Sequence, residues 1–254
     1  MRIYSNARDL MSEMGRELNS YGQIVKPKHY QNKSIEGNED FITKEIICQQ
    51  YCLTSLPDPE YLFKFTNTQE WAEVELEERI TALGENPGKA WRLNRSMWEE
   101  FLTEEGKFDY TYSERMSDVV TYKGTTLKKL SAIIQLLKDD PDTRKAILNI
   151  YGGYHHTKTY DQDYLDGSRR IPCSMYYDFL LREGPKGTQL NICYHQRSAD
   201  FVQHFGDDVY LAWNLMTFIA ERLEIKPGYL YHTIDSLHSY KKDWGLLRKN
   251  IDEL

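Results

Sequence analysis

One cysteine stands where its surroundings could make it reactive. Cys173 follows a proline at the start of an apolar, strand-like run, and Arg169 and Arg170 come shortly before it. A lone cysteine in such a position is most often a small buried hydrophobic side chain. Nearby positive charge, however, lowers the pKa of a thiol and favours the nucleophilic thiolate. The pattern therefore indicates either a packed core cysteine or a covalent catalyst.

Two cationic groups along the chain suit an anionic ligand. Arg197 and Ser198 follow the run "LNICYHQ" and combine a guanidinium fork with a hydroxyl group, which suits a phosphate dianion. Arg144 and Lys145 come directly after the turn "DPDT". Either group alone is typical of a solvated strand end. Together with Cys173 they favour a substrate that carries a phosphate group, without naming it.

An acidic pair precedes the clearest helical pattern of the chain. Asp207 and Asp208 come just before residues 209–223, in which five apolar side chains fall on one helical face. Aspartate is a preferred N-cap residue, so the simplest interpretation of Asp208 is a helix cap. The alternative is that Asp207 caps the helix while Asp208 faces a ligand.

The spacing of apolar residues and the positions of turn residues predict the helices and strands that must position these side chains. Helices are expected over residues 5–19, 68–84, about 126–138 and 209–223, and strands over residues 145–151, 173–184, 188–198 and 229–235. Residues 25–40 form a polar loop in this interpretation. Strands and helices do not alternate as in a repeated βαβ chain. The sequence therefore predicts an α+β fold with a mixed, largely antiparallel sheet, in a single domain over residues 1–254.

Composition excludes several classes of protein. The 254 residues are 40% hydrophobic and 13% aromatic, which is typical of a folded, enzyme-like domain. A net charge of −7 argues against direct binding to DNA. The four cysteines lack CxxC spacing, so neither a zinc site nor any other metal is expected. No signal peptide and no apolar run of roughly 18 residues is present. We expect a cytoplasmic protein without membrane contact, or one in the host cytoplasm if a phage encodes it.

Several motifs occur in the order and near the spacings of one enzyme family. They are "SMWEEFLTEEGKFDYTY", "PDTRKAILNIY", "IPCSMYY", "CYHQRSAD" and "GYLYHTIDSLHSY". The chain thus resembles members of the thymidylate synthase family from about residue 70 to residue 244. The resemblance implies the thymidylate synthase fold, 5,10-methylenetetrahydrofolate as co-substrate, and a homodimer whose subunits share active sites.

The resemblance also implies roles on the nucleotide side. Cys173 matches the nucleophile that adds to C6 of a pyrimidine nucleotide. Further matches concern phosphate and sugar: Arg197 and Ser198 bind the phosphate, Arg144 and Lys145 reach the phosphate of the neighbouring subunit, and His238 and Tyr240 hydrogen-bond the sugar hydroxyl. The phosphate-loop pattern "RxxRTGT" is absent, and Lys33 is our preferred substitute for it.

Other matches concern the cofactor and proton transfer. Trp98 keeps the position of a folate-side tryptophan, Asp200 that of the aspartate that meets the pterin, and Tyr112 that of a cysteine-side tyrosine. Glu75 matches the glutamate that organises water and proton transfer around the base. Its other interpretation is an exposed helix charge, because neighbouring acids leave the register open by two or three residues.

One departure from the family pattern concerns the base. The synthases carry an asparagine eight residues after the aspartate of QRSxD, and here that position is Asp208. Cytosine offers a donor at N4 and an acceptor at N3, the reverse of uracil, and a protonated carboxyl group matches that edge. Aspartate here, together with "SLHxY", resembles phage deoxycytidylate hydroxymethylases. The resemblance therefore implies dCMP, with Asp208 among the catalytic residues.

A second departure concerns the reaction product. Sixteen residues follow His238, fewer than in the synthases, whose tail seals the active site against water. We therefore expect water to complete the reaction and give 5-hydroxymethyl-dCMP and tetrahydrofolate. The alternatives are a dUMP hydroxymethylase or thymidylate synthase, a C5-methyltransferase or hydroxymethyltransferase acting on dCMP or CMP, and a nucleotide-binding protein that has lost catalysis.

Overall fold

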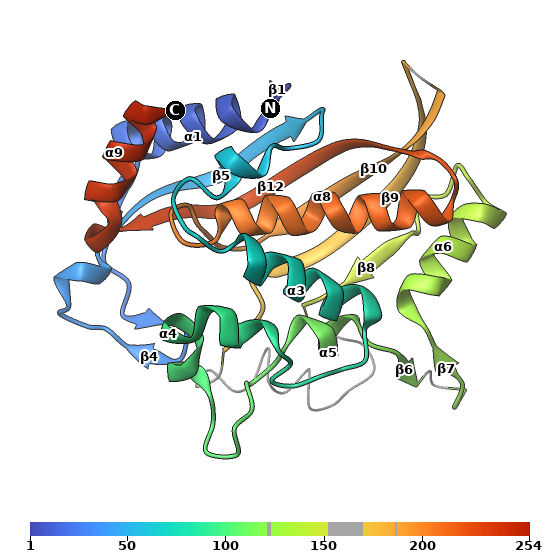
Figure 1. Cartoon of the computed structure of the whole chain (residues 1–254), viewed down its shortest axis with the longest axis horizontal. Helices are drawn as coiled ribbons and strands as arrows, with labels where there is room; N and C mark the ends of the chain where they lie inside the picture. The colour runs from blue at the N-terminus through green and yellow to red at the C-terminus, as the bar shows by residue number, and fades with distance from the viewer. Residues whose placement is uncertain (121–122, 152–169, 186) are drawn as a thin grey trace.

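A mixed β-sheet forms the centre of the computed structural model, which describes residues 1–120, 123–151, 170–185 and 187–254 (Figure 1). Its strand order is β1-β5-β12-β10-β9-β8, with β2 beside β5 and β11 beside β12. The strands are β1 (Arg2–Tyr4), β2 (Gln23–Val25), β5 (Thr43–Leu53), β8 (Ile147–Asn149), β9 (Ser174–Gly184), β10 (Gly187–Gln196), β11 (Ala199–Asp200) and β12 (Lys226–Tyr240). Both parallel and antiparallel pairs occur, and the long pairs β5–β12 and β9–β10 are antiparallel. The predicted α+β class is confirmed.

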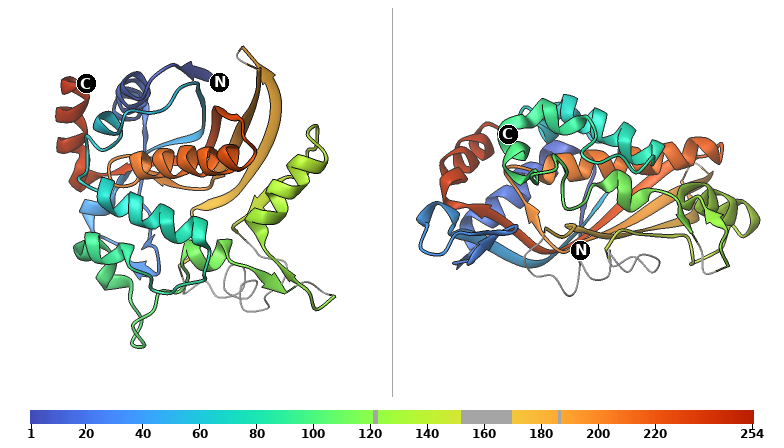
Figure 2. Two further views of the ribbon diagram at one scale, coloured as in Figure 1. Left: turned by 45° about the vertical axis from the view of Figure 1, so that its right-hand side comes forward. Right: turned by 90° about the horizontal axis from the view of Figure 1, so that it is seen from below.

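Helices cover one face of this sheet (Figure 2). Helix α8 (Phe205–Arg222) packs on β10 and β12, α1 (Ala7–Tyr21) packs on β5, and α3 (Gln69–Thr81) packs against α8. The remaining helical segments are α2 (Pro59–Leu62), α4 (Arg95–Trp98), α5 (Tyr112–Met116), α6 (Lys129–Asp139), α9 (Trp244–Glu253), η1 (Glu39–Phe41), η2 (Ala90–Asn94), η3 (Glu99–Phe101) and η5 (Lys241–Asp243). None of the helices in these described segments is long and apolar enough to cross a membrane.

Helix α8 is the main buried element and lies at the base of the candidate site. Its core face includes Leu215, Met216 and Ile219, all nearly inaccessible to solvent, which confirms the apolar periodicity. The helix begins four residues earlier than expected, with His204 at the N-cap position. The expectation that an aspartate caps α8 is therefore wrong. Asp207 and Asp208 lie inside the first turn, and their side chains are free to contact other elements.

Other boundaries differ from the expectation for local reasons. The predicted helix 126–138 begins only at Lys129, because β7 (Thr126–Leu127) pairs with β6 (Val119–Val120). Helix α3 ends at Thr81 because Ala82 adopts a left-handed conformation, two residues before the glycine expected to end it. The polar segment 25–40 holds a short hairpin, β3 (His29–Tyr30) and β4 (Lys33–Ser34).

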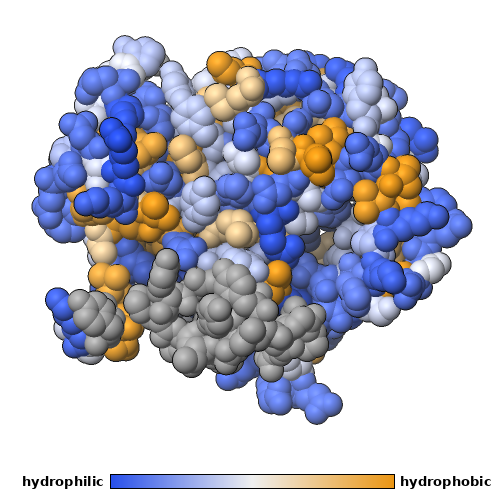
Figure 3. All heavy atoms as spheres, turned by 180° about the vertical axis from the view of Figure 1, so that it is seen from behind, coloured by the Kyte–Doolittle hydropathy of each residue, from blue (hydrophilic) through white to orange (hydrophobic). Residues whose placement is uncertain are grey.

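The opposite face of the sheet carries apolar side chains. Ile47 of β5, Ile147 of β8 and Tyr176 of β9 are exposed, and Figure 3 shows apolar side chains among polar ones on the side opposite Figure 1. In β12, buried residues alternate with half-buried or exposed ones from Gly228 to Ile234. Because consecutive side chains of a strand point to opposite faces, every second side chain packs against the helices and the others lie on this open face.

Gly206 in the first turn of α8 offers a test of this packing. A Cβ atom at Gly206 would lie 2.0 Å from the backbone oxygen of Leu62. We expect Gly206→Ala to lower the free energy of unfolding by roughly 1–3 kcal/mol, because backbone must move to admit the methyl group. In α9, Gly245 has no neighbour within 4 Å of such an atom, so Gly245→Ala should be neutral or mildly stabilising. Equal stability of the two variants in urea denaturation would contradict the packing.

Candidate active site

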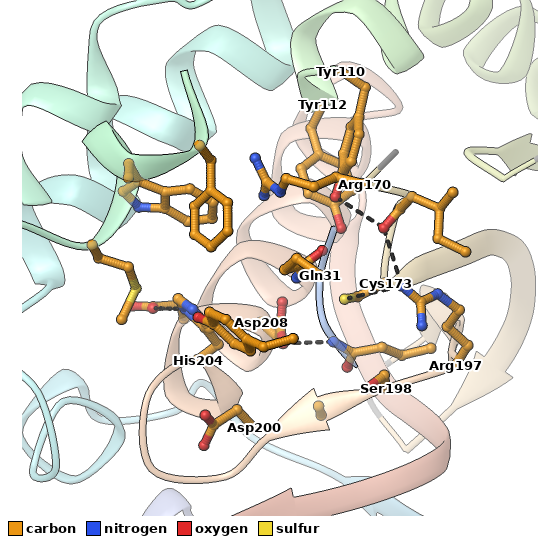
Figure 4. Close-up of a pocket in the computed structure, with 18 of the residues that line it drawn as sticks. Gln31, Tyr110, Tyr112, Arg170, Cys173, Arg197, Ser198, Asp200, His204 and Asp208 are labelled. Carbon is orange, nitrogen blue, oxygen red and sulfur yellow. Dashed lines mark hydrogen bonds and ion pairs between the residues drawn. The ribbon is translucent and has the colours of Figure 1, made fainter. Parts of the chain in front are cut away.

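A cavity of about 380 Å³ opens beside the first turn of α8. It is bounded by the β3–β4 hairpin, α3, the α4–η3 segment, the start of α5, and the ends of β10 and β12. The predicted site residues that line it are Trp98, Tyr112, Cys173, Arg197, Ser198, Asp200, Asp208, His238 and Tyr240. Figure 4 shows most of these side chains converging from different elements. Residues separated by up to 142 positions in the sequence thus share one cavity.

The half-buried thiol of Cys173 sits beside Arg197 at the edge of β9. The Nη2 atom of Arg197 lies 3.9 Å from Sγ, and the same guanidinium donates hydrogen bonds to the backbone oxygens of Pro172 and Ile171. Burial raises the pKa of Cys173, and the charges of Arg197 and Arg170 only partly offset this effect. Among the described residues desolvation therefore outweighs the positive charges, and the pKa of the thiol is raised, not lowered as expected.

Asp208 faces the cavity from the first turn of α8. Its Oδ2 atom accepts a hydrogen bond of 2.6 Å from Nε2 of Gln196, and its other oxygen points into the cavity beside Cys173 (Figure 4). Burial raises its pKa to about 6, although the hydrogen bond from Gln196 lowers it somewhat. With this pKa, roughly one Asp208 carboxyl group in ten carries a proton at pH 7, and that form can donate as well as accept.

The neighbouring Asp207 also lines the cavity and ties α8 to Thr68, the residue before α3. Its oxygens accept hydrogen bonds from Thr68 at 2.6 Å and face His204 Nδ1 at 3.4 Å. Burial disfavours the charged imidazole, but the contact with Asp207 raises the pKa of His204 above its ordinary value. Both adjacent aspartates line the cavity, but their hydrogen-bond partners differ. The alternative interpretation is therefore wrong for Asp207, which does not cap α8, whereas Asp208 faces the cavity as it expected.

Tyr112 is positioned by a capping box at the start of α5. The Thr111 hydroxyl accepts from the Glu114 backbone N–H at 3.1 Å, and the Glu114 carboxylate accepts from the Thr111 N–H at 2.9 Å. The Tyr112 hydroxyl then accepts from the backbone N–H of Ser174, the residue after Cys173, at 3.3 Å. Tyr112 thus lies on the cysteine side, where the sequence placed it.

Glu75 lies on α3 outside the main cavity. It lines a smaller side cavity and pairs with Arg79 one helical turn later, at 2.9 Å between Oε1 and Nε. Arg79 lines both cavities and stacks its guanidinium 3.8 Å from the ring centre of Tyr112. The side chain of Glu75 is only 14% exposed, so the interpretation as an exposed helix charge is wrong. Its role in water and proton transfer stays a prediction.

The two residues predicted to contact the folate, Trp98 and Asp200, both line the cavity. Trp98 stacks on Trp71 with 5.9 Å between ring centres, and His204 lies 5.7 Å from it at a tilt. Asp200 lies on β11 and accepts from the backbone N–H groups of Val202 and Gln203. Flat aromatic surfaces with a carboxylate fit a planar heterocycle such as a pterin.

The two residues predicted to bind the sugar hydroxyl, His238 and Tyr240, lie at the end of β12. His238 is half-buried, and its ring centre lies 5.2 Å from that of buried Tyr240. Tyr30 of the β3–β4 hairpin contacts Tyr240 edge-on at 5.6 Å. Burial raises the pKa of the Tyr240 hydroxyl, so this group stays protonated and able to donate. The hairpin therefore borders the cavity next to Tyr240, and the role of His238 and Tyr240 in binding a sugar stays a prediction.

Three predicted phosphate ligands lie elsewhere. Arg144 and Lys145 are exposed and do not line the cavity of their own chain. Lys33 pairs with Glu100 at 2.6 Å and does not line the cavity either. The preference for Lys33 as a phosphate ligand is therefore not supported. The contribution of Arg144 and Lys145 to a neighbouring subunit, and the homodimer itself, stay predictions.

Arg170 is a wall residue whose position sequence reasoning missed. Its guanidinium carbon lies 4.5 Å from the ring centre of Phe101 and 5.1 Å from that of Trp98, and the side chain is 4% exposed. Asp109 accepts from the Arg170 backbone N–H at 3.0 Å. The sequence showed only an arginine near Cys173. Its cation–π contacts with residues about 70 positions away could not be foreseen.

No three potential metal ligands cluster in the described parts of the chain. Arg169, predicted beside Cys173, lies outside the described residues. The site therefore combines a thiol, guanidinium groups, a titratable carboxyl group and aromatic walls. Such a set can add a nucleophile to an electron-poor ring while it holds an anion.

The thiol environment predicts an unusual alkylation profile. Iodoacetamide modification of Cys173, followed by mass spectrometry of its peptide, should rise with a midpoint above the ordinary thiol value of about 8.5. The reason is that burial disfavours the thiolate. Arg197→Met should shift the midpoint still higher, because Arg197 lowers the pKa. Exposed Cys48 in the same digest is the internal control. A Cys173 midpoint below 8.5, by about one pH unit, would show that the arginines dominate.

Comparisons with known proteins agree with this geometry. The family model described as thymidylate synthase matches residues 75–253. A putative thymidylate synthase from Methanosarcina barkeri (strain Fusaro / DSM 804) is 25% identical over 144 residues, which cover 57% of this chain and 58% of that protein. A deoxyuridylate hydroxymethyltransferase from Bacillus phage SP01 is 30% identical over 144 residues, which cover 54% of this chain and 35% of that protein. The matches thus span less than two thirds of either relative. With most of its length matched by the family model, the chain belongs to the thymidylate synthase family.

Proposed function

We propose that this protein hydroxymethylates dCMP at C5, using 5,10-methylenetetrahydrofolate and water. The single observation that carries the choice of cytosine is Asp208. The carboxyl group of Asp208 is half-buried and faces the cavity, and its pKa of about 6 allows it to be protonated. The overall reaction converts dCMP, the folate co-substrate and water into 5-hydroxymethyl-dCMP and tetrahydrofolate.

Asp208 matches the cytosine edge when it is protonated. The proton on the cavity-facing oxygen is donated to N3, and the carboxyl oxygens accept from the N4 amino group. Uracil offers N3–H and O4 instead, so its N3–H would meet the acid proton. A buried polar group left unpaired in this way costs roughly 1–3 kcal/mol. One residue can therefore select the base.

Cys173 provides the covalent step. Its sulfur forms a bond to C6 of the ring, and the electron pair of the C5–C6 double bond becomes nucleophilic at C5. Protonation of N3 by Asp208 stabilises the negative charge that spreads into the ring. Arg197 and Ser198 would hold the phosphate in reach of this thiol, since both line the same cavity.

The co-substrate supplies one carbon at the oxidation level of formaldehyde. Trp98 and Asp200 would hold its pterin ring, as the aromatic wall suggests. After that carbon is attached at C5, loss of the C5 proton and release of tetrahydrofolate leave an exocyclic methylene group on the nucleotide. Water adds to this group, and the sulfur leaves C6 as the ring double bond re-forms.

Two observations favour water over hydride in the last step. Helix α9 packs against α1, and residues 241–254 do not line the cavity, so this segment does not cover the reacting carbon. The phage relative is named a hydroxymethyltransferase. That name also supports a second candidate, hydroxymethylation of dUMP, because the relative is a deoxyuridylate enzyme.

Asp208→Asn separates these candidates. An asparagine amide can turn its oxygen to the N3–H of uracil and its NH2 group to O4. dUMP then gains a hydrogen-bond donor that an ionised carboxylate lacks, so the ratio of kcat/KM for dCMP to that for dUMP should fall at least tenfold. Purified wild type and variant are incubated with each nucleotide and the co-substrate, and products are identified by mass spectrometry. A gain of one CH2O unit shows hydroxymethylation, and a gain of one CH2 unit shows methylation.

Three results would contradict the proposal. Wild type could prefer dUMP, its product from dCMP could carry a methyl group, or Asp208→Asn could leave the preference for dCMP unchanged. The matched control is Asp235→Asn on β12, an exposed carboxylate outside the cavity, which should alter neither preference nor product.

A further inference from the structure

A chain of buried hydrogen bonds runs from Asp208 and Gln196 in the cavity wall to His232 and Tyr51, which do not line the cavity. Gln196 Nε2 donates to Asp208 Oδ2 at 2.6 Å, Gln196 Oε1 lies 3.0 Å from His232 Nε2, and His232 Nδ1 lies 2.9 Å from the Tyr51 hydroxyl. Tyr51, His232 and Gln196 are each 1% exposed. The chain crosses the sheet from β5 through β12 to β10 and ends on α8.

His232 sets the donor-to-acceptor direction of this series of hydrogen bonds, because its proton can sit on either ring nitrogen. Its ring is stacked 4.3 Å from Tyr194 and lies parallel to Phe205, and burial lowers its pKa to about 3. The imidazole is therefore neutral, with one N–H donor and one bare nitrogen. Which nitrogen carries the proton decides which way the whole chain of hydrogen bonds runs.

The two possible directions have different consequences at Asp208. If Nε2 carries the proton, it donates to Gln196 Oε1, and the Gln196 amide then donates to Asp208 Oδ2. Oδ2 is an acceptor in that case, and a proton on Asp208 must sit on Oδ1. If Nδ1 carries the proton, the Gln196 amide turns over, its oxygen faces Asp208, and the proton of Asp208 sits on Oδ2, where it points to Gln196 and not to N3 of the base.

Tyr51 decides between the two directions. Burial raises the pKa of its hydroxyl well above the ordinary value, so this group keeps its proton and needs an acceptor. The described residues offer it one partner, His232 Nδ1. An N–H at Nδ1 would leave the Tyr51 proton unpaired, at the cost of an unsatisfied buried donor. The Tyr51 hydroxyl therefore favours the tautomer of His232 in which Nε2 is protonated and Nδ1 accepts.

We propose that Tyr51 and His232 are positioning residues that, through Gln196, place the acidic proton of Asp208 on the oxygen that faces the base. This inference rests on the proposed function, because it explains how Asp208 donates to N3 of cytosine. It adds a specificity determinant on β5, in a strand that does not line the cavity. Without the relay, Asp208 would present a bare acceptor, which suits the N3–H of uracil.

Tyr51→Phe is the matching variant, since it removes the donor and keeps the ring. We expect the ratio of kcat/KM for dCMP to that for dUMP to fall about tenfold, the factor that one neutral buried hydrogen bond supports. Tyr4→Phe is the control, because Tyr4 is also buried, contacts the Tyr51 ring edge-on at 6.2 Å and has no hydrogen bond to the relay. It should leave the ratio unchanged. If Tyr51→Phe lowers both reactions equally, the role of Tyr51 is only structural and the proposal is wrong.

The imidazole form can be measured without any substrate. In protein labelled with 15N-histidine, two-bond 1H–15N correlations should show His232 protonated on Nε2 in wild type, and protonated partly on Nδ1 in Tyr51→Phe. Protonation of wild-type His232 on Nδ1 would overturn the relay even if dCMP is the substrate. Conversely, a wild type that prefers dUMP or turns over neither nucleotide would overturn the proposed function, while the NMR result still decides the relay.

Discussion

The hydrogen bond from Gln196 Nε2 to Asp208 Oδ2 fixes the chemistry that the cavity can perform. It holds a carboxyl group of the first turn of α8 in the wall of the cavity. Gln196 can do this because it is the last residue of β10, held on its other side by buried His232. Strand order places β10 between β9 and β12, so the same strand end also brings Arg197 to Cys173.

Three arginines around the cavity are each held by a different partner. Arg197 is bound to backbone oxygens next to Cys173, Arg79 is paired with Glu75, and Arg170 is enclosed by aromatic rings. A buried charge is unfavourable unless it is paired or stacked, and here backbone oxygens, a carboxylate and aromatic rings each stabilise one arginine. Arg197 lies beside the thiol, and Arg79 and Arg170 lie in the cavity walls, while the carboxyl group of Asp208 is bonded to the uncharged amide of Gln196.

Much of this arrangement could be predicted from the sequence. Helix α8 and the strands β9, β10 and β12 have clear apolar periodicity, and the motif residues around Cys173 and Arg197 fall at strand ends. Strand β5 escaped prediction because its central residues are half-buried or exposed and Cys48 has a positive φ, which interrupts the alternation. Long-range contacts such as that of Arg79 with the ring of Tyr112, or of Arg170 with its aromatic rings, depend on packing. The raised pKa of Cys173 likewise follows from burial, which local spacing does not show.

The identity of the base is the centre of the proposal, and competition measures it most directly. Equal amounts of dCMP and dUMP, each carrying tritium at C5, are incubated together with the protein and 5,10-methylenetetrahydrofolate, and release of tritium from each is followed by chromatography of the remaining nucleotides. Both bases then meet the same enzyme in the same solution. If protonated Asp208 selects cytosine, tritium leaves dCMP at least tenfold faster than dUMP. Faster release from dUMP would contradict the assignment of Asp208 as the residue that reads cytosine.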